Sequence, residues 1–398
     1  MNGRRGVAYE EFQATGFFSG LDGLRAFAVV AVIWQHTSGN PGPELLSQGG
    51  FGVDLFFAIS GFLITTLLLR ERRRNGRIAL RSFAVRRVFR IMPVYYAVLV
   101  VYVVLVLATR RGTPEGDGFL ANLPAFLTYT SNWFVDLDAG PSVPFYFAWS
   151  LATEEQFYLF WPPLLALLLF RAARSRAGGS GGIGSGGRRA AVAPLAALGA
   201  LVAVGQLAIA QGSRDLPIVI LSSLALPILL GAAMAVLLDH RPGFEAVAPW
   251  VSARWFAPVA AAGVLASLAW QTPTQLTQVL MVLLVASVGV SESTLLHPLL
   301  RWPPIAHVGA VSYGMYLMHM LCANALRPAL GERFGIPLFV LTTVLAVIVA
   351  SVSRTVFEAP LQRVGRRLSE GMAARRERPP SRAGAAVSRP TGPDETRR

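Results

Sequence analysis

The chain contains no lysine, so all 36 of its basic residues are arginine. Schiff-base chemistry and a lysine nucleophile are therefore excluded. It has one cysteine, Cys322, which rules out a disulfide within the chain and a cysteine-rich zinc or iron–sulfur site. Charged residues are scarce as well, at 15% of the 398 residues. A soluble protein of this length would need more polar surface than that.

Hydrophobic residues make up 53% of the sequence. Apolar runs of about 20 residues, the length that crosses a bilayer core of about 30 Å, recur along the chain. We therefore predict an all-α polytopic membrane protein, a bundle of about ten transmembrane helices. The expected spans lie near residues 22–39, 51–70, 91–109, 147–170, 190–211, 216–238, 255–270, 274–291, 305–327 and 335–357.

The net charge of +14 lies mainly in the segments between these runs. This pattern favours the positive-inside rule over nucleic-acid binding, so we expect no nucleic-acid partner. Nine arginines and one glutamate fall in residues 70–90, and the Gly/Ser-rich segment 171–189 has basic ends. Both are predicted to be cytoplasmic, whereas 110–146, with more acidic than basic residues, is predicted to lie outside. An even number of spans then places both termini in the cytoplasm.

The expected organisation is a transmembrane domain, residues 1–362, followed by a basic cytoplasmic tail, residues 363–398. The tail is rich in arginine, proline and alanine, so we expect it to lack fixed structure. The first apolar run is followed by further spans, so no cleavable signal peptide is expected. These features predict a multi-pass protein of the inner (plasma) membrane. The sequence carries no clear signal for an oligomer interface.

The first apolar run holds two ionisable residues eleven positions apart, Arg25 and His36. On a helix they share one face and lie about 16–17 Å apart along the axis. Ionisable groups inside a membrane are costly and usually mark a functional site. Two simpler interpretations remain open: Arg25 could reach the headgroups with Asp22 beside it, and His36 could be a hydrogen-bonded residue at the interface.

Two further spans carry acidic residues. Asp54 shares a helix face with Ala58 and Gly61, whose small side chains permit close helix contact and would bury the carboxylate in protein. Glu154 and Glu155 are adjacent in an aromatic, apolar run. Because they point about 100° apart, at least one of them must face a polar interior.

Polar residues in two further stretches form two more patterns. Ser312, Tyr316 and His319 share one face of a late span, which predicts either a functional seam or hydrogen bonding between helices. Arg87 and Arg90 share a face just before the third span. Two guanidinium groups at this spacing suit a phosphate clamp, although cytoplasmic charge alone would also explain them.

These stretches occur in a specific order: LDGLRAFAVVAVIWQH, GVDLFFAISGF, FAVRRVFRIMP, WSLATEEQFY, SYGMYLMH and FEAP. The ordered set resembles the acyltransferase 3 family of integral membrane acyltransferases. The resemblance implies about ten membrane helices and transfer of an acyl group, acetyl in the first place, from acyl-CoA to a hydroxyl of a carbohydrate or of a glycosylated metabolite such as a macrolide. It places the functional residues at Arg25, His36, Arg87, Arg90 and Glu154.

The sequence departs from the family in two places. Some members continue into a soluble esterase-like domain, whereas this chain continues into a short basic tail, so we expect it to act alone. Members often have an arginine before the Gly231–Ala232 stretch, and this chain has IVILSSLALPILLG there. The departure weakens any prediction of polar contacts from the sixth span.

The resemblance suggests a mechanism in which acyl-CoA is a co-substrate and no cofactor or metal is permanently bound. Arg25, Arg87 and Arg90 would hold the phosphates of CoA, and neutral His36 would act as the general base. Glu154 would orient the imidazole or position the acceptor. Further polar residues are expected to support this site: Asp22, Asp54, Ser60, Glu155, Ser312, Tyr313, Tyr316 and His319.

Two alternatives remain open from the sequence. A transporter or flippase for a sugar-linked or lipid-linked substrate would also explain ionisable groups inside the membrane. It would not explain the cytoplasmic arginine pair or the ordered motifs. A structural or sensory subunit without chemistry fits the polar seams least well.

Overall fold

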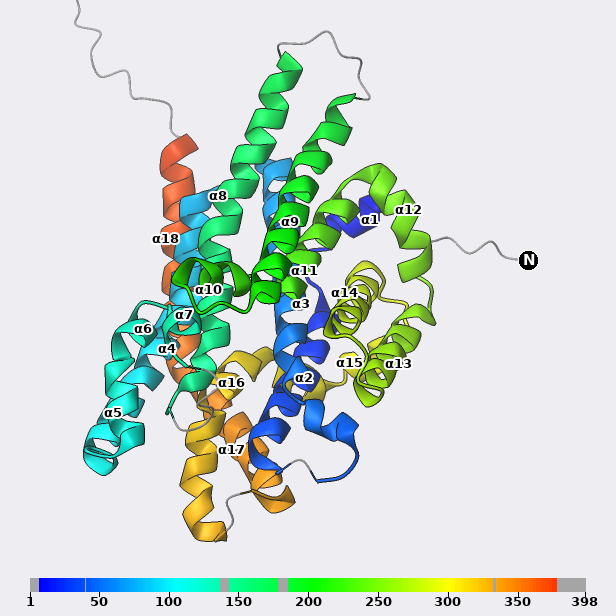
Figure 1. Cartoon of the computed structure of the whole chain (residues 1–398). Helices are drawn as coiled ribbons and strands as arrows, with labels where there is room; N and C mark the ends of the chain where they lie inside the picture. Colours follow the sequence, from blue (N-terminus) through cyan, green and yellow to red (C-terminus); the bar gives the residue numbers. More distant parts are fainter. Residues whose placement is uncertain (1–6, 40, 137–142, 178–184, 332–333, 378–398) are drawn as a thin grey trace, which may run out of the picture.

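The computed structural model describes residues 7–39, 41–136, 143–177, 185–331 and 334–377. Within these ranges the chain is built from helices and their connections, with no strand (Figure 1). This confirms the predicted all-α class. Such a result follows from the long apolar runs, because only intrahelical hydrogen bonds can satisfy the backbone of a single segment in lipid.

The longer helices make up most of the bundle. They are α2 (Ser19–Thr37), α3 (Phe51–Asn75), α4 (Leu80–Thr109), α8 (Trp149–Ala177), α9 (Ser185–Gln211), α11 (Leu226–Asp239), α12 (Arg241–Val251), α13 (Phe256–Ala269), α14 (Thr274–Val290), α16 (Pro303–Leu330), α17 (Ile336–Ser353) and α18 (Ala359–Glu377). Shorter helices connect or precede them: α1 (Tyr9–Ala14), α5 (Pro114–Ala121), α6 (Leu123–Leu127), α7 (Ser131–Phe134), α10 (Leu216–Ser222) and α15 (His297–Leu300).

Six helical segments among the described residues are long and apolar enough to cross a membrane, or up to eight if two bent pairs each count as one span. The chain is therefore a multi-span membrane protein, but the count of about ten spans is not confirmed. The expected span 216–238 is broken between α10 and α11, which are bent by 49°. Pro227 occupies the first turn of α11, where its missing N–H costs little. The expected span 274–291 corresponds to α14, which has only 17 residues and is not counted among the six.

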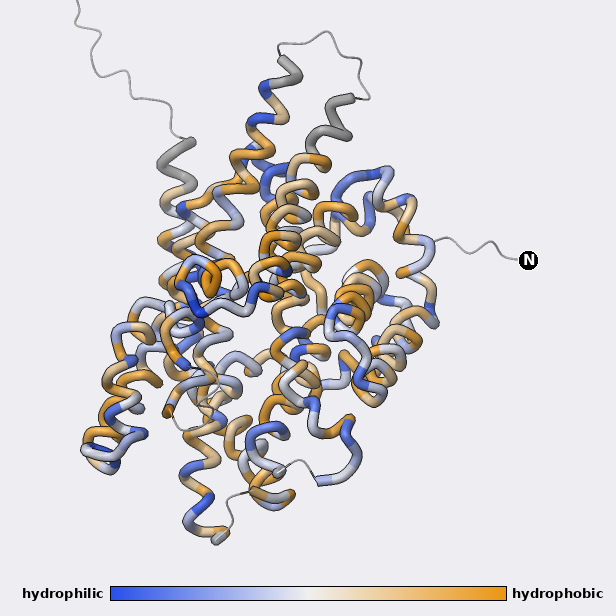
Figure 2. The backbone as a smooth tube through the Cα atoms, in the orientation of Figure 1, coloured by the Kyte–Doolittle hydropathy of each residue, from blue (hydrophilic) through white to orange (hydrophobic). Residues whose placement is uncertain are grey.

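Hydrophobic residues follow the lengths of the helices, and hydrophilic residues gather towards helix ends and connections (Figure 2). Large apolar side chains on the outward faces of α4 and α17 are exposed, among them Val104 at 58% and Ile348 at 54%. Exposed apolar surface on this scale is expected where lipid, rather than water, surrounds the protein.

The core contains close helix crossings at glycine. A Cβ atom at Gly61 of α3 would lie 1.9 Å from the carbonyl oxygen of Ile228, and one at Gly231 of α11 would lie 2.3 Å from that of Ala58. The small-residue face predicted for this span is thus a helix contact. Asp54, on the same helix, is half-buried and is hydrogen-bonded to Gln278 of α14.

The helix α2 packs against α3, α14, α16 and α17. At its crossing with α16, a Cβ atom on Gly309 would lie 1.8 Å from the carbonyl oxygen of Asp22. The two backbones therefore touch beside Arg25. Asp22 and Arg25 therefore lie next to another helix of the protein and not next to lipid, although an apolar stretch follows them in α2.

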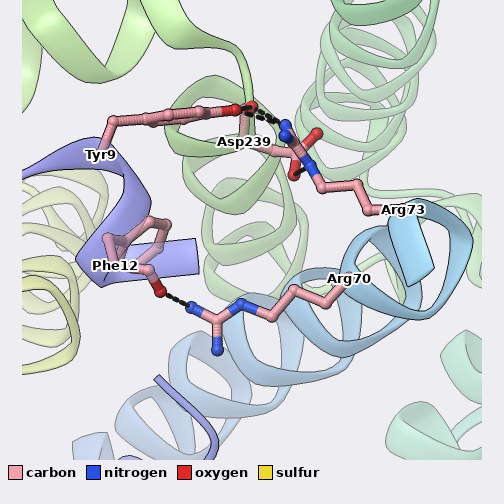
Figure 3. A network of polar contacts seen from close by, with 5 residues as sticks. All are labelled: Tyr9, Phe12, Arg70, Arg73 and Asp239. Atoms are coloured by element: carbon pink, nitrogen blue, oxygen red, sulfur yellow. Dashed lines mark hydrogen bonds and ion pairs between the residues drawn. The ribbon is translucent and has the colours of Figure 1, made fainter. Parts of the chain in front are cut away.

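A polar network ties the N-terminal segment to the bundle (Figure 3). Arg70 of α3 donates hydrogen bonds to the backbone carbonyls of Phe12 and Thr15, and its guanidinium lies 4.9 Å from the ring centroid of Phe12. Arg73 forms an ion pair with Asp239 at 2.9 Å. Arg70 is thus buried and structural, although the sequence suggested only a loop charge.

The end of α18 corrects the expected tail. Residues 363–377 are helical, so the expectation that fixed structure ends at 362 is wrong for them, whereas 378–398 lie outside the described residues. The helix packs on α4: a Cβ atom on Gly365 would lie 2.6 Å from Cβ of Phe89, and Arg86 Nη1 lies 2.9 Å from Ser369 Oγ. The division into two domains at residue 362 stays a prediction.

The linker predicted at 171–189 is also partly helical. The helix α8 continues to Ala177 and α9 begins at Ser185. Residues 178–184 of the linker lie outside the described residues.

Candidate functional site

A cavity of about 530 Å³ lies among α2, α3, α4, α8, α16 and α18, and we call it the arginine cavity. It brings together every site residue predicted from the sequence except Asp54, His36 and His319. The predicted residues that line it are Asp22, Arg25, Ser60, Arg87, Arg90, Glu154, Glu155, Ser312, Tyr313 and Tyr316. They come from five helices, so only the tertiary fold makes them one site.

The three predicted arginines are held differently. Arg25 forms an ion pair with Asp22 at 2.8 Å, within one turn of α2. The Arg87 guanidinium lies 4.8 Å from the ring centroid of Tyr158, a cation–π distance. Arg90 is exposed, and its side chain lines the cavity.

The cavity is also lined by two arginines that the sequence did not indicate, Arg354 and Arg366. Arg354 lies in the π-helical turn Arg354–Glu358 and donates a hydrogen bond to the backbone carbonyl of Ala310. Arg366 comes from α18, which the sequence assigned to the tail. Arg354 falls inside the expected span 335–357, and the only signal for Arg366 was basic charge after that span, which the positive-inside rule explained equally well.

The two glutamates lie in the arginine cavity, not beside His36. Glu154 accepts hydrogen bonds from the hydroxyls of Ser60 and Tyr158. Its neighbour Glu155 lines the same cavity. The structure therefore does not form the contact between Glu154 and His36 that the sequence suggested.

A second cavity, of about 1120 Å³, contains His36 and is called here the histidine cavity. The His36 ring meets that of Tyr146 edge to face, with centroids 6.0 Å apart. Arg327 and Asn324 of α16 also line the cavity, and Arg327 donates a hydrogen bond to the Asn324 side chain. The mixture of aromatic rings, amides and a guanidinium suits a polar organic ligand.

A chain of contacts along α16 connects the two cavities. Tyr316 lines the arginine cavity, and its hydroxyl lies 2.6 Å from that of Ser150. One turn further along the helix, His319 is fully buried, and its Nε2 lies 3.0 Å from Nδ1 of His36. The predicted seam of Ser312, Tyr316 and His319 thus runs from one cavity to the base of the other.

Two results concern other predicted ligands. Asp54 lines neither cavity, and its side chain is hydrogen-bonded to Gln278. Within the described ranges, no group of three or more histidine, cysteine, aspartate or glutamate side chains could hold a metal ion.

Titratable side chains enclosed by apolar helices define an integral membrane protein with a reaction or transport site inside the bundle. Residues 18–354 match the family model described as an acyltransferase domain. The chain belongs to the acyltransferase 3 family, as its ordered motifs indicated.

Curated relatives are similar over part or most of this chain. It is 31% identical over 389 residues to the Bacillus subtilis protein named "Putative peptidoglycan O-acetyltransferase YrhL", an alignment that covers 90% of this chain and 57% of the relative. It is 39% identical over 157 residues to the peptidoglycan O-acetyltransferase OatA of Listeria monocytogenes, covering 37% of this chain and 24% of the relative. This chain thus spans about half, or less, of these relatives. No solved structure matches it.

Proposed function

We propose that the protein is a membrane O-acyltransferase that moves an acyl group, acetyl in the first place, from acyl-CoA to a hydroxyl of a carbohydrate. The observation that carries this proposal is the arrangement of two cavities along one helix. One cavity holds a cluster of arginines and the other holds His36. The relatives named as peptidoglycan O-acetyltransferases support a carbohydrate polymer as the acceptor. A glycosylated metabolite would be a smaller acceptor that also offers a sugar hydroxyl.

The arginine cavity suits the nucleotide end of acyl-CoA. Guanidinium groups bind phosphate through paired, charge-assisted hydrogen bonds. Arg25, Arg87 and Arg90 face a common space and would share the phosphates of the donor. The eleven residues from Arg25 to His36 correspond to about 16–17 Å of helix, which the extended arm of CoA can cover.

The histidine cavity suits the acceptor. Neutral His36 would take the proton of the acceptor hydroxyl while the oxygen attacks the thioester carbonyl. The carbon–sulfur bond then breaks, the ester forms, and CoA leaves as the thiolate, which receives the proton from the imidazolium. Glu154 lies on the donor side and would act through Ser60 and Tyr158, which it holds by hydrogen bonds.

The arrangement also indicates how the protein sits in a membrane. The tips of α8, α9 and α18 lie at one end of the molecule, at the top of Figure 1, and the end of α16 and the start of α17 lie at the other. The last turns of α8 and α18 each carry two or more arginines, so we propose that this end faces the cytoplasm and that the protein resides in the plasma membrane with both termini inside. Both relatives are named as acetyltransferases, so they do not support the transporter alternative.

The proposal is tested with purified protein in lipid nanodiscs. Acetyl-CoA and a soluble peptidoglycan fragment are added, and both free thiol and acetylated acceptor are measured over time. We expect thiol release that depends on the acceptor and matches the acetyl groups found by mass spectrometry. If a panel of carbohydrate and glycosylated acceptors gives neither product, an acyltransferase activity on this class is excluded.

A further inference from the structure

The contact between His36 and His319 has a direction that follows from the atoms involved. His319 Nδ1 lies 2.5 Å from the backbone carbonyl oxygen of Tyr316. A carbonyl oxygen can only accept, so Nδ1 of His319 must carry a proton. In a neutral imidazole the other nitrogen, Nε2, is then an acceptor.

His319 is neutral because of where it lies. Its side chain is fully buried, against the ring of Phe147 at 5.1 Å and that of Tyr316 at 5.8 Å. The ionisable groups that act on it are His36 and Arg327, both of which would oppose a positive charge. A buried charge without a partner is costly, so an imidazolium at this position is strongly disfavoured.

The tautomer of His36 then follows. Its Nδ1 lies 3.0 Å from His319 Nε2, which can only accept. The ring of His36 also donates to the backbone carbonyl of Val32, one turn back in α2. Because His319 Nε2 can only accept, the single proton of neutral His36 is placed on Nδ1, which leaves Nε2 without a proton. We propose that His319 is a positioning residue that holds His36 in this tautomer and makes Nε2 the basic atom offered to the histidine cavity. This inference rests on the proposed acyltransferase function.

The same bond would support the reaction after proton transfer. When His36 becomes an imidazolium, its Nδ1–H donates more strongly to the lone pair of His319, as a group placed behind a catalytic histidine does in a triad. His319 lines neither cavity, so it does not contact donor or acceptor. Its removal should therefore lower kcat and leave the KM of acyl-CoA unchanged.

Two substitutions of similar bulk separate this role from packing. His319→Gln keeps an oxygen that can accept from His36 and an amide that can donate to the Tyr316 carbonyl. His319→Leu fills the site but offers neither. We expect kcat to fall at least about 10²-fold in His319→Leu, the lower limit for loss of acid–base function, and less than about tenfold in His319→Gln. Equal loss in two variants that both remain folded would overturn the proposal.

A spectroscopic measurement keeps the inference separate from the proposed function. Nitrogen-15 NMR of histidine-labelled protein distinguishes the two neutral tautomers, and a His36→Ala sample identifies the His36 signals. We expect an Nδ1–H tautomer for His36 in the wild type and its loss in His319→Leu. An Nε2–H tautomer in the wild type would refute the role of His319, whatever the activity. If the tautomer is as expected but no acyl transfer occurs, it is the proposed function that fails.

Discussion

At the scale of single residues, the arginines of the arginine cavity differ in whether another side chain of the protein contacts the guanidinium group. Arg25 is paired with Asp22, and Arg87 stacks on Tyr158. Arg90 makes no hydrogen bond or ion pair to any described residue. A guanidinium without a protein partner keeps its donors for a ligand. Arg90 is therefore the residue on which a bound phosphate should depend most.

This difference gives a prediction about donor binding. Arg90→Ala should raise the KM of acyl-CoA more than Arg87→Ala does, with a loss of about 1.5–3 kcal/mol, or roughly 10- to 150-fold, for a charge-assisted contact. Steady-state kinetics with acetyl-CoA measures it. Arg81→Ala is the control, because Arg81 lies on the same helix but does not line the cavity. A defect of the same size in all three variants would argue against a phosphate site at Arg90.

A second prediction concerns the base. His36→Ala should lower kcat at least about 10²-fold, because acid–base groups contribute that much or more. The control is His307→Ala, an exposed histidine of α16 that bonds to Ser351 outside both cavities. Acetyl transfer is followed by mass spectrometry of the acceptor. If purified, folded His36→Ala turns over at the wild-type rate, His36 is not the base.

The sequence sufficed to place single residues on helix faces. The spacing of Arg25 and His36, and of Ser312, Tyr316 and His319, needs only the helical repeat, and both sets lie as expected along α2 and α16. The partners of Glu154 could not be found in this way. Ser60 lies 94 positions away in the chain, so only the tertiary fold brings the two together.

At the scale of helices, the site depends on how closely backbones approach. The contact at Gly61 was predictable, because Ala58 and Gly61 form a small-residue face within one segment. The contact between Gly309 and Asp22 joins two distant segments and has no signal in either one alone. The helix α18 was missed because its composition is polar, and it is held by packing on α4 instead.

The crossing of α2 and α16 gives a prediction about stability. Gly309→Ala places a methyl group where the Asp22 carbonyl oxygen would be 1.8 Å away, so the helices must separate. We expect a loss of about 1–3 kcal/mol in the free energy of unfolding, seen as a lower Tm. Gly199→Ala is the matched control: its Cβ would meet nothing within 4 Å, and alanine favours a helix. Equal Tm values for the two variants would contradict the close contact.

The helix α18 gives a prediction about the donor site. Arg366 lines the arginine cavity, whereas the adjacent Arg367 does not. Arg366→Gln should raise the KM of acetyl-CoA several-fold, and Arg367→Gln should leave it unchanged. Because Arg366 is exposed, its contribution should shrink at high salt. A KM that is insensitive to Arg366 would confine the donor site to the helices before α18.

At the scale of the whole molecule, α2 lines both cavities, and under the proposed mechanism it carries the donor site and the base at separate depths. Arg25 lines the arginine cavity near the start of the helix, and His36 lines the histidine cavity near its end, about 16–17 Å further along the axis. The helix runs from the interior of the bundle towards the end of the molecule where α16 ends and α17 begins (Figure 1). Under the proposed topology, the arginine cavity lies nearer the cytoplasm, where acyl-CoA is made.

This arrangement predicts that the two substrates arrive from opposite sides of the membrane. The protein would pass an acyl group across the bilayer without moving the whole of CoA. In sealed inside-out vesicles, external acetyl-CoA should therefore acetylate a polymeric glycan held in the lumen. The same glycan supplied outside should be a poor substrate. A charged polymer is the proper acceptor here because it cannot cross the membrane. Efficient acetylation of external glycan alone would mean that both substrates meet on the cytoplasmic face, and the cross-membrane route would have to be abandoned.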